Sequence, residues 1–98
     1  MTQIYWTSRA DADLMVLHDF ASRNSEPYAS LLVQRILRSV KRLEDFPLSG
    51  RSVPEFARAD IRELIVVPYR IVYRVLETEV HVLIVQHGAR QLPDVLPI

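Results

Sequence analysis

The spacing of apolar residues changes once along the chain, from a helical period in the first half to a period of two in the second. The helical period is clearest between residues 27 and 46, where the apolar stripe consists of Tyr28, Leu32, Ile36, Val40 and Leu43. From Ile61 onward, side chains alternate in the manner of β-strands. Helical and strand patterns in separate segments predict an α+β fold.

Three elements are predicted in the first half. Residues 3–7 are short and rich in β-formers, which favours a strand. Ser8 stands three residues before Asp11, a capping-box spacing, and predicts a helix from about residue 9 to 23. Pro27 fits the first turn of a second helix that we expect to reach Phe46. The loop between the helices is short, so they should pack antiparallel.

The second half predicts three strands, at residues 61–67, 69–76 and 80–86, followed by a tail at 91–98 without regular structure. The expected order is β-α-α-β-β-β in one domain spanning residues 1–98. It forms a small, mainly antiparallel sheet with a two-helix hairpin on one face. Alternation directs Tyr69, Ile71 and Tyr73 toward the helices, and Arg70 and Arg74 toward solvent or a partner.

Composition excludes several classes of protein. The 98 residues contain no cysteine, which excludes disulfides, thiolate zinc sites and cysteine nucleophiles. The formal net charge is zero, so we expect no specific DNA binding by this chain alone and no attraction to membrane surfaces. No apolar run is long enough to span a bilayer, and the first residues do not resemble a signal peptide, so we expect a cytoplasmic protein.

Cations are concentrated in the middle of the sequence. Residues 35–74 carry nine basic and five acidic side chains, and nearly all the bases are arginine. Arginine pairs well with carboxylates and phosphates. Two interpretations of Arg70 and Arg74 stay open from the pattern alone. They form a surface for an acidic protein or a phosphate, or they are ordinary exposed residues paired with Glu63 or Glu77.

The histidines show no metal-binding spacing, and no cofactor motif is present. His81 and His87 are six residues apart on one strand, which predicts the same side of the sheet and a separation of about 20 Å. His87 is the only plausible general base, at the end of the last strand. The position of His87 is also that of a partly exposed strand terminus, and no nucleophile motif accompanies it, so we assign no catalytic, metal or cofactor residue.

Five segments, taken in order, resemble the toxins of bacterial type II toxin–antitoxin modules, the group that includes the ParE and RelE toxins. These segments are Trp6 with Ala10–Leu14, Phe46–Arg51, Arg62–Leu64, Pro68–Val75 and Val85–Arg90. The compact sheet and helical hairpin of that group agree with the fold predicted from periodicity.

The resemblance implies one of two activities. RelE-like members are ribosome-dependent mRNA endonucleases, and Arg70 and Arg90 occupy two of their arginine positions. Their late tyrosine is replaced here by Leu96, and Arg62–Ile65 stands where they carry a pair of lysines. ParE-like members lack that set and inhibit DNA gyrase by protein–protein contact, and their ending resembles His87–Arg90.

The resemblance therefore favours a ParE-like, plasmid-stabilisation type of toxin that is not an enzyme. It would bind gyrase and be neutralised in a hetero-oligomer with a cognate antitoxin. The alternatives are an mRNA endonuclease and an antitoxin-binding scaffold that has lost toxicity. The candidate partner-binding residues are Arg35, Arg38, Arg42, Arg51, Arg70, Arg74, His87 and Arg90.

Overall fold

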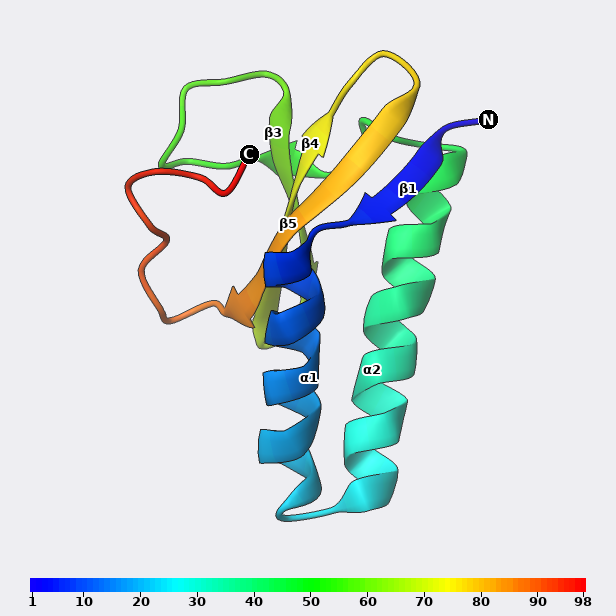
Figure 1. Ribbon diagram of the computed structural model, residues 1–98, viewed down its shortest axis with the longest axis vertical. Coiled ribbons are helices and arrows are strands. Elements are labelled where there is room, and N and C mark those ends of the chain that lie inside the picture. The colour runs from blue at the N-terminus through cyan, green and yellow to red at the C-terminus, as the bar shows by residue number, and fades with distance from the viewer.

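A two-helix hairpin lies against one face of a five-stranded sheet in the computed structural model, which describes residues 1–98 (Figure 1). The elements are β1 (Gln3–Trp6), α1 (Ser8–Ser22), α2 (Glu26–Lys41), a 3-10 turn (Arg42–Glu44), β2 (Arg51–Ser52), β3 (Ile61–Val66), β4 (Tyr69–Val75) and β5 (Glu79–His87). The strand order is β1-β5-β4-β3-β2, and only β1 pairs with its neighbour in parallel. The predicted α+β architecture is confirmed, with the two-residue β2 as an addition.

Both helices begin at side-chain caps. The Thr7 hydroxyl accepts a hydrogen bond from the Ala10 N–H, so the cap of α1 lies one residue before the predicted Ser8. The Ser25 hydroxyl accepts from the Tyr28 N–H at the start of α2, with Pro27 in the first turn. The second helix ends earlier than predicted, because the chain tightens into a 3-10 turn from Arg42.

The main core lies between the hairpin and the sheet. It contains Ala10, Leu17 and Ala21 from α1, and it contains Ala29, Leu32, Ile36 and Val40 from α2. Ile71 and Tyr73 meet them from β4, with Tyr69 packed at the border, so the predicted helix-facing side of this strand is confirmed. Tyr28 is half exposed, although the sequence pattern placed it in the buried stripe. The neighbouring Ala29 is buried in its place.

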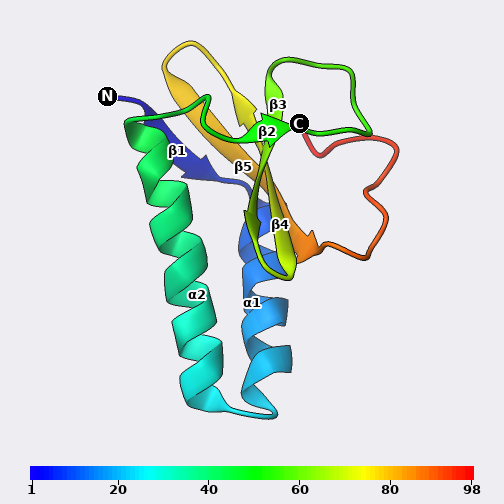
Figure 2. The ribbon, with the colours of Figure 1, turned by 180° about the vertical axis from the view of Figure 1, so that it is seen from behind.

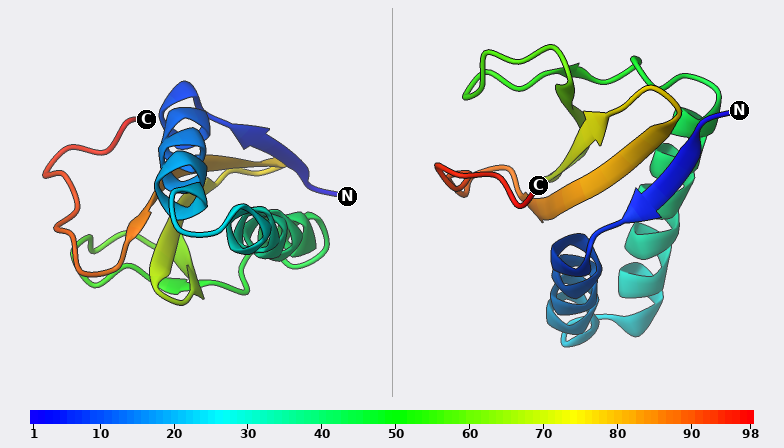
Figure 3. Two further views of the ribbon diagram at one scale, coloured as in Figure 1. Left: turned by 90° about the horizontal axis from the view of Figure 1, so that it is seen from below. Right: turned by 45° about the horizontal axis from the view of Figure 1, so that its top comes forward.

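The opposite face of the sheet is also covered. Leu92 and Leu96 of the tail pack on Val72 and Ile84, in a second cluster that also contains Val53, Ile61 and Leu83. Figures 2 and 3 show the tail (red) and the segment between β2 and β3 (green) together on the side away from α2. The tail has no helix or strand, as predicted, but it serves as a cover for the sheet.

A β-bulge interrupts β5. Val72 pairs with Ile84 while the next residue, Tyr73, pairs with Val82, so Leu83 is an extra residue in the ladder. The extra residue reverses the alternation along β5. His81 lies opposite Arg74, and His87 lies opposite Tyr69. The two histidines therefore face opposite sides of the sheet, and the prediction that they share one side is wrong.

Neither helix is long and apolar enough to cross a bilayer.

Candidate functional site

The structure distributes the eight predicted partner-binding residues over several places. Arg35, Arg38 and Arg42 are exposed along the C-terminal half of α2 and beyond its end, and none of them forms an ion pair. Arg74 is half buried and donates to Asp60 at 3.3 Å. The other four are Arg51, Arg70, His87 and Arg90, and they lie around two hollows at the end of the sheet where β4 begins and β5 ends.

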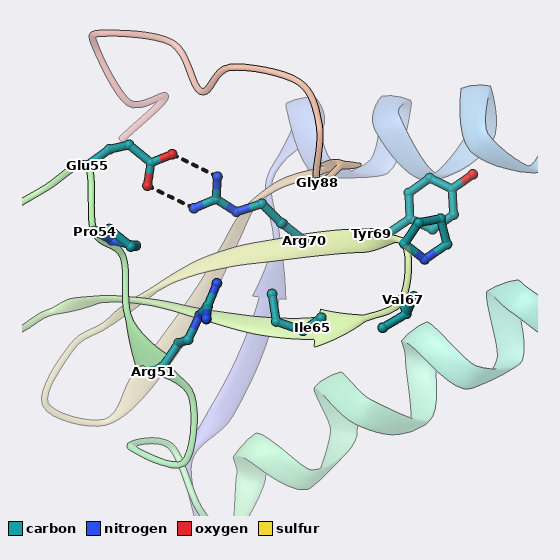
Figure 4. A pocket seen from close by; sticks show the side chains of 9 residues that line it. Arg51, Pro54, Glu55, Ile65, Val67, Tyr69, Arg70 and Gly88 are labelled. Carbon is teal, nitrogen blue, oxygen red and sulfur yellow. Dashed lines mark hydrogen bonds and ion pairs between the residues drawn. The ribbon is translucent and has the colours of Figure 1, made fainter.

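Arg70 is buried, which corrects the prediction that it faces solvent or a partner. Its side chain is 10% exposed, because the segment between β2 and β3 folds over this face. Its Nε donates to Glu63 Oε1 at 2.6 Å. Its Nη1 and Nη2 donate to the two Glu55 oxygens at 2.7 and 3.0 Å (Figure 4). The pairing with Glu63 that the sequence left open is thus present, but in the interior.

Glu63 connects two arginines. Its side chain is fully buried, and its second oxygen, Oε2, accepts from Arg51 Nε at 2.7 Å. Hydrogen bonds from Arg70 hold the pKa of the Glu55 carboxyl below its usual range, and the bonds to Glu55 raise the pKa of Arg70. Each partner of the Arg70–Glu55 pair thus favours the charged form of the other. We call Arg51, Glu55, Glu63 and Arg70 the ion-pair chain; its formal charge is zero.

The ion-pair chain limits what Arg70 can do chemically. Both terminal nitrogens are engaged in a bidentate bond with Glu55, which is the geometry that a phosphate or a foreign carboxylate would need. An external anion reaches Arg70 only by displacing Glu55.

Two further positions at which this chain differs from RelE-like toxins have structural roles. Leu96, where RelE-like toxins are expected to carry a tyrosine, is 7% exposed and packs in the second core cluster. Arg62, in the segment where those toxins carry lysines, donates from Nη1 to the carbonyl oxygen of Gly50 at 2.9 Å. Each side chain is thus committed to an internal contact.

A groove of about 560 Å³ runs between α1 and the end of β5. Strand β1 pairs with β5 only as far as Val82, so beyond this residue α1 replaces a strand at that edge. The Asp13 carboxylate accepts a hydrogen bond from the Val85 N–H at 3.0 Å and another from Arg9 Nε. We call this hollow the α1–β5 groove; it is lined by Arg9, Asp13, Val16, Leu17, Phe20, Tyr69, Val85, Gln86, His87 and Arg90.

The wall that α1 contributes to this groove was not predicted from the sequence. Val16 and Phe20 are 68% and 63% exposed, although both are large and apolar. They are four residues apart and lie outside the buried stripe of α1, so a second apolar stripe on this helix was the available signal. On the opposite wall, the ring of Tyr69 meets that of His87 edge-on at 5.8 Å, and burial raises the pKa of Tyr69.

No group of three or more His, Asp or Glu side chains is arranged to hold a metal ion.

Comparison with known proteins places the chain among toxins. Residues 4–92 match the family described as the ParE toxin of type II toxin–antitoxin system, parDE. Toxin RelE2 of Caulobacter vibrioides is 37% identical over 91 residues, which cover 92% of this chain and 99% of that protein. Putative toxin Y4kP of Sinorhizobium fredii is 34% identical over 99 residues, which cover 96% of each.

A solved structure described as the chromosomal ParDE TA system from P. aeruginosa has the same fold. Its TM-score is 0.73 at 28% identity, over 89% of this chain and 96% of that one. The fold and these relatives define a toxin of the type II toxin–antitoxin class. The chain belongs to the ParE toxin family, and this membership implies an antitoxin partner.

Proposed function

We propose that this toxin acts by binding DNA gyrase, through protein–protein contact and without catalysing a reaction. The observation that carries the proposal is the engagement of Arg70 by Glu55 and Glu63. A ribonuclease needs cations free to stabilise the charge that develops on a phosphate. The arginine that resembles the ribonuclease residue here is neutralised by two carboxylates.

The side chains available for a target are at the surface. Arg35, Arg38 and Arg42 are exposed along and just beyond α2 and form no ion pair, so they are the candidates for the gyrase contact. An arginine-rich helix surface suits an acidic protein surface, because the guanidinium fork pairs with carboxylates. The protein would act in the cytoplasm, where gyrase works.

Supercoiling of relaxed plasmid by purified gyrase tests this proposal. We expect inhibition by the toxin, and release of that inhibition when the antitoxin is added in equal amount. The control reaction contains toxin that is already bound to antitoxin, which should not inhibit gyrase. Full supercoiling activity at a tenfold excess of free toxin would remove gyrase as the target.

We propose that the antitoxin binds in the α1–β5 groove. Val16 and Phe20 offer an exposed apolar wall, with His87 and Arg90 beside it. Arg9 is paired with Asp13, so Arg90 is the cation of this groove that forms no ion pair within the chain. Charge complementarity therefore favours an antitoxin segment that is apolar on one side and acidic on the other.

Substitution in α1 distinguishes this groove from the rest of the helix surface. We expect Val16→Asp to weaken the complex by at least about tenfold, because the new carboxylate would be desolvated against the antitoxin. Met15→Asp is the matched control, since Met15 is the adjacent residue and also 68% exposed, yet it does not line the groove. Isothermal titration calorimetry with the antitoxin measures the affinity of both variants. Equal affinities for the two variants would place the antitoxin elsewhere.

A further inference from the structure

The ion-pair chain has one open end. In order, it runs Glu55, Arg70, Glu63, Arg51, so negative and positive groups alternate. Glu55 uses both oxygens on Arg70, and Glu63 uses one oxygen on each arginine. Arg51 closes the series with only its Nε engaged, and its two terminal nitrogens have no partner. A carboxylate from outside the molecule would continue this alternation of charges.

Arg51 is held ready for such a partner. Its side chain is 63% exposed, but its Nε is fixed at 2.7 Å from a carboxylate that is fully buried. The orientation of the guanidinium is therefore set before anything binds, which reduces the entropy lost on binding. Two parallel donors on a fixed fork match the two oxygens of a carboxylate.

The open end of Arg51 lies at a pocket of about 400 Å³ on the face of the sheet away from the helices (Figure 4). Ile65, Val67 and Pro68 form its apolar wall, and the first two are 45% and 72% exposed. Strand β2 pairs only with Arg62 and Glu63, so it leaves the outer edge of Leu64–Val66 unpaired. These features fit a ligand that carries a carboxylate beside an apolar group.

We propose that this pocket binds one acidic side chain of the antitoxin, with an apolar neighbour resting on Ile65 and Val67. The inference rests on the antitoxin partner of the proposed function. Tyr69 lines both this pocket and the α1–β5 groove, so one segment passing over the β3–β4 turn reaches both. A nucleic acid fits less well, because Glu55 is 40% exposed in the same pocket and repels a string of phosphates.

The first test replaces Arg51. We expect Arg51→Met to weaken binding of the antitoxin, taken as the product of the neighbouring gene, by about tenfold or more, since a hydrogen-bonded charge pair is lost. Arg58→Met is the matched control, because Arg58 is also exposed but pairs with Asp60 outside the pocket. Isothermal titration measures affinity, and thermal unfolding confirms that both variants remain folded.

A second substitution leaves the ion-pair chain intact. We expect Val67→Glu to weaken antitoxin binding by a similar factor, because it places a like charge where the partner's carboxylate would lie. Val95→Glu is the control and should have no effect, since Val95 is 83% exposed and lies outside the pocket. Unchanged affinity in both pocket variants overturns the proposal, even where Val16→Asp shows that the groove is used. Loss of gyrase inhibition with unchanged antitoxin affinity also overturns it, since the pocket would then serve the target. Tighter binding of a single-stranded RNA oligonucleotide than of the antitoxin would contradict it as well.

Discussion

Replacing Arg70 by alanine is expected to lower the free energy of unfolding by about 3–5 kcal/mol, a large part of the stability of a domain of this size. Arg70 is 10% exposed, and Glu63 beside it is fully buried. The substitution leaves Glu63 with a single partner, Arg51, in a place that water does not reach. Removing one of the two partners of a buried carboxylate is far more destabilising than the loss of an exposed ion pair.

Urea unfolding of the variant measures this effect, and Arg35→Ala is the control, because Arg35 is exposed and unpaired. The double variant Glu63→Met, Arg70→Met should recover most of the loss, because apolar side chains of similar volume often replace a buried ion pair without penalty. If Arg70→Ala is as stable as Arg35→Ala, the burial of Arg70 described here is wrong, and the residue is available for a functional role.

Replacing Gly50 by alanine is expected to destabilise the protein by about 2–4 kcal/mol, through overpacking and a lost hydrogen bond. A Cβ at this position would lie 2.7 Å from the Glu63 carbonyl oxygen and closer still to the Tyr73 hydroxyl. That hydroxyl accepts from the Gly50 N–H and donates to the Pro47 carbonyl oxygen, both at 2.9 Å. It is therefore held from both sides and cannot move away without breaking these bonds.

Gly88→Ala is the control for this position. There a Cβ would meet the Pro68 carbonyl oxygen at 3.2 Å, a contact that a small shift can relieve. Thermal unfolding should show a clearly larger decrease in melting temperature for the Gly50 variant. A smaller decrease for Gly50 than for Gly88 would mean that the turn is not clamped by Tyr73.

The helices, the β-α-α-β-β-β order along the chain and the helix-facing side of β4 could be predicted from the sequence, because each follows from the period of a continuous segment. The stripe from Leu32 to Val40 defines one helix face, and the alternation of Ile71 and Tyr73 defines one strand face. Such patterns depend only on neighbours along the chain.

What covers the second face of the sheet could not be predicted in the same way. Alternation correctly separated Arg70 from the helix-facing residues, but it carried no information about distant segments that fold over it. Glu55 reaches Arg70 from the segment before β3, and Leu92 and Leu96 arrive from the tail. The bulge at Leu83 likewise leaves no mark in a strand that is almost uniformly apolar, so His81 and His87 were wrongly expected to share one side of the sheet.

The segments that carried the family resemblance turn out to meet in space. Gly50 contacts Tyr73, Arg51 pairs with Glu63, and Glu63 pairs with Arg70. The Gly88 N–H donates to the Pro68 carbonyl oxygen at 2.7 Å. Much of the sequence pattern therefore describes how the turns are fixed to the sheet, so the pattern predicts the fold better than the activity.

We propose that Arg70 serves the fold and that the toxin does not cleave mRNA. Primer extension on a translated mRNA, isolated from cells whose growth the toxin has arrested, tests it most directly. A ribosome-dependent ribonuclease of the same superfamily supplies the positive control. We expect only full-length message, with no new 5′ end at any codon of the reading frame. New 5′ ends within translated codons, appearing with the arrest and absent when the antitoxin is present, would contradict it.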